Sequence, residues 1–233
     1  MKKNVATKTM VWQTAIISAV MAFFIIVNIS GCSFDKSFPD LSNAGNVVCF
    51  ETEVLPVIQS NCAKAGCHDA VSHAEGYDFS NYDGIVKAVK PGKPNSSKLY
   101  KVLSGSGEGL MPPPPNTPLT AEQQATIKLW IEQGALDLTC TTVTCDTTNV
   151  TYSGSVVPIL QNYCLGCHAN QSTGGGILLN TYDEVVYQAL YGNLLGAVSG
   201  EPGMVPMPLN GSPLDECKIT TIEIWVNNGT PNN

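Results

Sequence analysis

Apolar side chains recur at helical spacing near the end of two related stretches of the chain. In the first stretch, Ile127, Trp130 and Ile131 are spaced i, i+3 and i+4, which is typical of one face of an amphipathic helix. Thr120 and Gln123 precede them as T-x-x-Q, the pattern of a capping box. The pattern therefore predicts a helix that begins after Thr120.

The same pattern recurs about 95 residues later, where Asp215 can cap a second helix. Its inward positions would be Ile219, Ile222, Trp225 and Val226. We expect shorter helices over residues 53–61, 83–89, 96–103, 155–163 and 183–191, separated by loops rich in Gly and Pro. These expectations together predict an all-α fold.

The chain contains one pattern twice. Val54, Pro56 and Gln59 match Val156, Pro158 and Gln161 at an offset of 102, and the offset is 100 for Cys67-His68 with Cys167-His168 and 95 for Trp130 with Trp225. Self-similarity of this kind indicates a structural unit used twice. We call residues 49–140 the first repeat and residues 145–233 the second repeat, joined by a linker over residues 141–144.

The N-terminus has the pattern of an export signal. Three lysines precede an apolar run from about residue 11 to 27, which ends at Ile29-Ser30-Gly31-Cys32. The small residue before Cys32 resembles a bacterial lipobox, which implies cleavage before Cys32 and acylation of its thiol. Residues 1–31 would then be a lipoprotein signal peptide and residues 32–48 an exported tether. The alternative is an uncleaved transmembrane anchor; both place the repeats outside the cytoplasm, on the periplasmic side or the cell surface of a bacterial membrane.

The charge of the chain argues against nucleic acid as a partner. Residues 1–31 hold three of the 12 lysines and no carboxylate, so the remaining residues carry nine positive and 19 negative side chains. The chain has no arginine. Binding of nucleic acid needs a basic face that neutralises phosphate, so we exclude it.

The cysteine pairs predict haem attachment. Cys164, Cys167 and His168 form C-x-x-C-H, the c-type haem attachment motif. In the first repeat, four residues separate Cys62 from Cys67, which precedes His68. The change of offset from 102 to 100 falls between the two cysteines, so the first pair is the same site with two residues inserted.

Two other uses of such cysteines fit less well. A redox dithiol of the thioredoxin type needs a surrounding βαβ pattern, which is absent. A zinc site needs four ligands, whereas each repeat offers two cysteines and one histidine. Only His73 remains, which we expect in a solvent-facing loop.

A methionine can complete each haem site. In this chemistry two thiols add across the haem vinyl groups and the adjacent histidine binds the iron, while the sixth ligand is often a methionine. Aligning Met-Pro with Met-Pro pairs Met111 with Met207, although Met204 lies three residues from Met207. The alternative is that these methionines only pack in a core.

The remaining cysteines predict disulfides. Of the nine cysteines, one is assigned to lipid and four to haem, which leaves Cys49, Cys140, Cys145 and Cys217. An even remainder in an exported protein suggests two bridges, with three possible pairings. We favour Cys49 with Cys140 and Cys145 with Cys217, which gives each repeat its own bridge. The main rival joins Cys140 to Cys145 and Cys49 to Cys217.

Each repeat resembles a small class I c-type cytochrome and is similar to planctomycete-type cytochrome c domains. The stretches V-L-P-V-I-Q-S-N-C, G-C-H, L-M-P-P-P and I-K-L-W-I-E-Q-G-A carry the match, which covers about residues 49–140 and 145–231. The resemblance implies a cytochrome c-like module around one haem in each repeat. It assigns the haem thiols to Cys62, Cys67, Cys164 and Cys167, and the iron ligands to His68, Met111, His168 and Met207. The four-residue spacer departs from the family pattern.

The sequence thus predicts a membrane-anchored cytochrome with two covalently attached haem c groups. It would relay electrons between a protein donor and a protein acceptor and would not act as an enzyme. The alternatives are a dihaem peroxidase, which needs an open sixth position on one iron, and a non-redox scaffold or sensor. A group of lysines in the first repeat is either a solvated face or a docking patch for an acidic redox partner; it comprises Lys87, Lys90, Lys93, Lys98 and Lys101.

Overall fold

The structure is a computed structural model that describes residues 47–105, 109–140, 145–171 and 173–233. The predicted signal peptide, Cys32, most of the tether and the linker lie outside these residues. The described segments contain helices and turns and no strand, so the predicted all-α class is confirmed for them. None of their helices is long and apolar enough to cross a membrane.

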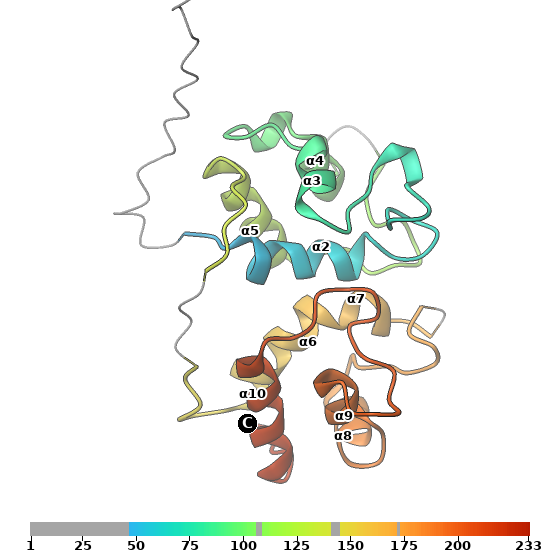
Figure 1. Ribbon diagram of the computed structural model, residues 1–233, viewed down its shortest axis with the longest axis vertical. Coiled ribbons are helices and arrows are strands. Elements are labelled where there is room, and N and C mark those ends of the chain that lie inside the picture. Colours follow the sequence, from blue (N-terminus) through green and yellow to red (C-terminus); the bar gives the residue numbers. More distant parts are fainter. Residues whose placement is uncertain (1–46, 106–108, 141–144, 172) are drawn as a thin grey trace, which may run out of the picture. The chain divides into compact units, whose positions relative to one another are not determined.

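The described residues of the first repeat form four α-helices, and Figure 1 shows how these are arranged. A π-helical turn over Phe50–Val54 (η2) runs directly into α2, and short 3₁₀ turns connect the later helices. Thr120 and Gln123 form the predicted capping box at the start of the last helix. The helices are α2 (Leu55–Asn61), α3 (Tyr82–Ile85), α4 (Lys98–Ser104) and α5 (Ala121–Glu132).

The second repeat follows the same order. A π-helical turn over Tyr152–Val156 (η6) leads into the first helix, and Asp215 caps the last one by accepting a hydrogen bond from the Lys218 amide, as predicted. The helices are α6 (Val157–Tyr163), α7 (Leu165–His168), α8 (Tyr182–Leu190), α9 (Leu194–Ser199) and α10 (Glu216–Asn227). The sequence did not predict α7 or α9.

A group of three aromatic rings has the same arrangement in both repeats. In the first, the Phe50 ring lies 5.1 Å from Tyr82, edge to face, and 5.3 Å from Trp130. In the second, Tyr152 lies 5.0 Å from Tyr182 and 5.3 Å from Trp225. Edge-to-face contacts between aromatic rings are favourable because ring edges are positive and ring faces are negative. Each group thereby joins the first helical turn, the middle helix and the last helix of its repeat.

The buried apolar residues form two clusters, and each lies within one repeat. The first cluster spans residues 48–135 and the second residues 156–225. The inward positions of α5 predicted from the sequence, Ile127, Trp130 and Ile131, are all buried. Ile222 and Trp225 of α10 are buried too, whereas Ile219 and Val226 are partly buried against the second cluster. All the described residues belong to one compact unit.

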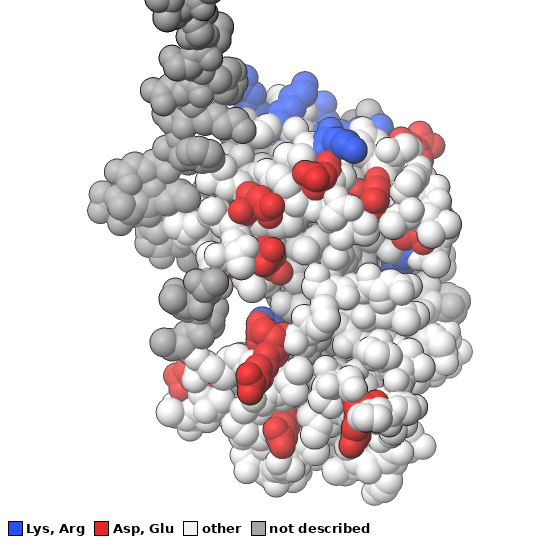
Figure 2. All heavy atoms as spheres, in the orientation of Figure 1, with Lys and Arg blue, Asp and Glu red and all other residues white. Residues whose placement is uncertain are grey.

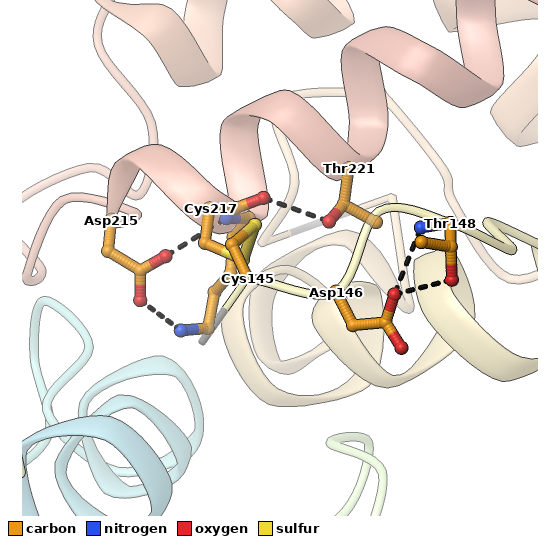
Figure 3. Close-up of a disulfide and its surroundings, with 7 residues drawn as sticks. Cys145, Asp146, Thr148, Asp215, Cys217 and Thr221 are labelled. Atoms are coloured by element: carbon orange, nitrogen blue, oxygen red, sulfur yellow. Dashed lines mark hydrogen bonds and ion pairs between the residues drawn. A yellow bond between two sulfur atoms is a disulfide. The ribbon is translucent and has the colours of Figure 1, made fainter. Parts of the chain in front are cut away.

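Each repeat contains one disulfide. Cys49 is joined to Cys140 and Cys145 to Cys217, with Cα–Cα distances of 5.7 and 5.5 Å. This is the pairing that we favoured, and the rival bridge between Cys140 and Cys145 is wrong. Figure 3 shows how the Cys145–Cys217 bridge ties the start of the second repeat to the first turn of α10, beside the capping residue Asp215.

Candidate functional site

The two cysteine–histidine segments have the same backbone closure despite their different lengths. In the second repeat the His168 amide donates a hydrogen bond to the Cys164 carbonyl oxygen at 2.9 Å. In the first, the His68 amide reaches the Cys62 carbonyl oxygen at 3.1 Å. The two extra residues are accommodated by a turn that includes Gly66 at a φ of 81°, a conformation that glycine adopts without steric cost. The inserted residues therefore bulge out and leave the relation of histidine to first cysteine intact.

Both histidine rings are oriented by a backbone carbonyl. Nδ1 of His68 lies 2.9 Å from the Ala74 oxygen, and Nδ1 of His168 lies 3.1 Å from the Ile177 oxygen. A carbonyl can only accept, so Nδ1 must carry the proton, and Nε2 of a neutral ring keeps its lone pair. Histidines that bind metals are typically held in this way. Each ring could thus bind a metal ion such as a haem iron through Nε2.

The four cysteines of these segments are not bridged. Cys62 and Cys164 are buried, while Cys67 and Cys167 are half-buried. Loss of hydration on burial raises the pKa of Cys62 and of Cys164 to about 12. A reactive dithiol needs a lowered pKa, so these environments disfavour redox exchange between the paired thiols.

A cavity of about 250 Å³ lies beside the first segment. His68 and Met111, the two predicted iron ligands of the first repeat, both line it. Its wall is largely apolar and includes Tyr77, Phe79, Leu99 and Val102. The Phe79 ring lies 4.8 Å from the His68 ring. This donor pair in an apolar cavity fits a haem iron with His and Met ligation.

Met111 and Met207 occupy equivalent places in the two repeats. The Met111 amide donates to the Val102 oxygen of α4 at 3.0 Å, and the Met207 amide donates to the Ala197 oxygen of α9 at 2.9 Å. The Met204 amide instead bonds to Glu201 within a local turn. Among the two candidates of the second repeat, Met207 is therefore the one that shares the backbone contact of Met111.

Several residues of the site were missed by the sequence reasoning. Tyr77 and Phe79 lie beside His68 in the first repeat, and the repeat offset of 100 places Ile177 and Leu179 at the matching positions. A comparison of the repeats position by position would have shown that aromatic residues in the first repeat are replaced by aliphatic residues in the second. His73 is exposed, as predicted, with Nε2 3.9 Å from the Asp78 carboxylate.

The predicted lysine group lies on one side of the first repeat. Figure 2 shows lysine side chains gathered over the region of α4, whereas acidic side chains are spread across the visible face. The Lys98 ammonium lies over the Tyr77 ring, 5.3 Å from its centre, and Lys98 also lines the cavity. Through Lys98, the group therefore reaches the wall of the cavity that His68 and Met111 line.

Comparison with known proteins gives one family match. A family model described as planctomycete cytochrome C matches residues 65–115, a stretch that includes Cys67, His68 and Met111. No curated protein and no solved structure matches the chain. The match supports a relationship to cytochromes c, whose members carry covalently bound haem for electron transfer and are generally found outside the cytoplasm.

Proposed function

We propose that the chain is an anchored cytochrome with two haem c groups, which relays electrons between a protein donor and a protein acceptor outside the cytoplasm. The observation that carries the proposal is that His68, with its Nδ1 held by a carbonyl, and Met111 line the same largely apolar cavity. The family match to residues 65–115 supports the same chemistry.

In the first repeat, Cys62 and Cys67 would hold the haem through its vinyl groups and His68 and Met111 would bind its iron. Haem supplies a one-electron change between ferric and ferrous iron. The Ala74 carbonyl keeps the proton on Nδ1 of His68. Tyr77, Phe79 and the other apolar residues of the cavity would keep water from the iron, so that the fold tunes the cofactor and does no bond chemistry on a substrate.

The second repeat supports a second haem through shared features. His168 has the same type of Nδ1 contact as His68, Met207 has the same backbone contact as Met111, and the aromatic group is repeated. We therefore assign Cys164 and Cys167 to attachment, and His168 and Met207 to the iron. Each repeat would be one cytochrome c-like module.

The remaining parts of the proposal concern location and partners. An acylated Cys32 would hold the protein on a bacterial membrane, with residues 32–48 as a tether. The lysine group beside the first cavity would favour docking of an acidic redox partner, because complementary charge speeds and orients encounter. A Cys32→Ser variant tests the anchor: it should be released from membranes or remain unprocessed, whereas normal processing with membrane retention would indicate a transmembrane segment.

Peroxide turnover separates the relay from the enzyme alternative. With a methionine on each iron, neither site is open to peroxide, so the purified protein should be reduced and reoxidised by small-molecule mediators but should not consume peroxide. Steady consumption of peroxide by the wild type would favour a dihaem peroxidase and contradict the relay.

A further inference from the structure

The cysteine–histidine segments of the two repeats contact each other directly. Their leading helices, α2 and α6, pack together. The Ser60 hydroxyl donates to the Asn162 carbonyl oxygen at 3.0 Å, and these two residues hold equivalent places at the repeat offset of 102. The Cys167 sulfur lies 3.7 Å from the Ser60 carbonyl oxygen. The two haem-attachment segments therefore share one interface.

Gly166 allows this close approach. A β-carbon at Gly166 would lie 2.1 Å from the carbonyl oxygen of Ser60 and 2.4 Å from its carbonyl carbon. Both obstacles are backbone atoms of the first repeat, so they cannot turn aside as a flexible side chain would. The spacer between Cys164 and Cys167 thus carries glycine where the other repeat comes nearest.

Lys64 reaches across the same interface from the longer spacer. Its Nζ donates to the Gly166 carbonyl oxygen at 2.9 Å and to the Asn116 side-chain oxygen at 2.8 Å. The first contact joins the two repeats, and the second fixes the ammonium against the loop that follows Met111. Lys64 lies between Cys62 and Cys67, so it belongs to the segment that carries the two-residue insertion.

We propose that the four-residue spacer is a joint between the repeats, in which Lys64 is a positioning residue that places one positive charge between the two haem sites. This rests on the function proposed above. Adding one electron to either iron lowers the charge of that site by one, and a nearby cation stabilises the reduced form. Because Lys64 is half-buried, salt screens it less than an exposed lysine. Lys64 thereby raises the midpoint potentials of both haems together.

The first test replaces the cation in the full chain carrying both haems. In a spectroelectrochemical titration, Lys64→Met should shift both midpoint potentials to lower values. Lys64→Arg keeps the positive charge, so its potentials should stay close to those of the wild type. Lys128→Met is the matched control, because Lys128 pairs with Glu132 on α5 and belongs neither to the joint nor to the lysine group; it should leave both potentials close to the wild type. A fall in only one potential, no fall, or an equal fall in the control would overturn the proposal.

The second test removes the insertion. Deleting Lys64 and Ala65 gives a C-x-x-C-H segment of standard length. The variant should keep both haems by intact mass and show the lowered potentials of Lys64→Met. If this variant loses the haem of the first repeat, the inserted residues are needed for haem attachment, and the proposal that they join the repeats is wrong. A wild type that carries fewer than two haems would instead overturn the proposed function, so the two failures are distinguishable.

Discussion

The Met207 amide nitrogen lies 2.9 Å from the Ala197 carbonyl oxygen, the same contact that Met111 makes with Val102 in the other repeat. This relationship favours Met207 over Met204 as the methionine that would bind the iron of the haem proposed for the second repeat. A thioether bound to ferric iron gives a weak absorption band in the far red. Met111→Ala and Met207→Ala should each remove about half of that band.

Met204→Ala is the matched control for these substitutions, because it removes the same side chain three residues away. Its spectrum should equal that of the wild type. If Met204→Ala removes the part of the far-red band that belongs to the second repeat while Met207→Ala does not, Met204 binds the iron there and Met207 does not.

The orientation of His168 depends on a glycine. A β-carbon at Gly174 would lie 2.6 Å from the Ile177 carbonyl oxygen and 2.9 Å from Nδ1 of His168. We expect Gly174→Ala to disturb the second haem site and to lower the free energy of unfolding by about 1–3 kcal/mol, as overpacking does.

Ala74 holds the matching position in the first repeat at the offset of 100, so Ala74→Gly is the reciprocal control. The two variants are compared by chemical denaturation and by the absorption of the reduced haems. A normal second haem spectrum and unchanged stability in Gly174→Ala would show that His168 does not need this contact.

The Cys145–Cys217 bridge should stabilise the second repeat. It joins residues 72 positions apart, and a bridge that closes a loop of this length contributes on the order of 4 kcal/mol in the chain-entropy model. Replacing both cysteines with serine should therefore lower the midpoint of denaturant unfolding. Unchanged stability of the double variant would contradict a structural role.

The cap of α10 should make stability depend on acid. Burial alone would raise the pKa of Asp215, but hydrogen bonds and charge from Lys218 hold it below the ordinary value overall. A carboxyl whose pKa is lowered in the folded state stabilises the protein fully at pH values above its pKa in the unfolded chain, which is about 4. This stabilisation is lost as the pH falls through the pKa of Asp215 in the folded protein.

Asp215→Ala should cost about 1 kcal/mol at neutral pH, and the cost should shrink in acid. Thr151→Ala removes a neutral cap in the same repeat, where Oγ1 accepts a hydrogen bond from the Gly154 amide at the start of η6, so its cost should not vary with pH. Unfolding experiments at neutral and acidic pH measure both. An equal loss at every pH in the two variants would show that the charge of Asp215 adds nothing.

The sequence predicted elements that have strong local signals. The caps at Thr120 and Asp215 and the buried faces of α5 and α10 were all found in this way, because capping residues and helical spacing are local properties. Helix α9 (Leu194–Ser199) was missed because it is short and Gly196 within it weakens its helical propensity. Its place was nevertheless implied by the repeat, since an offset of 95 brings α4 to residues 193–199.

Contacts between distant residues were harder to predict. The disulfide pairing and the choice between Met204 and Met207 depend on how far-apart segments meet, so spacing alone left alternatives open. The contact of Lys64 with Gly166 crosses 102 residues. Nothing in the composition of the spacer distinguishes Lys64 from an ordinary solvated lysine.

The intact mass of the mature protein, combined with a pyridine haemochrome assay, tests the central claim most directly. The account predicts two covalently bound haem c groups per chain, one of them attached through Cys62 and Cys67. A mass that corresponds to one haem, with Cys62 and Cys67 joined to each other, would contradict it.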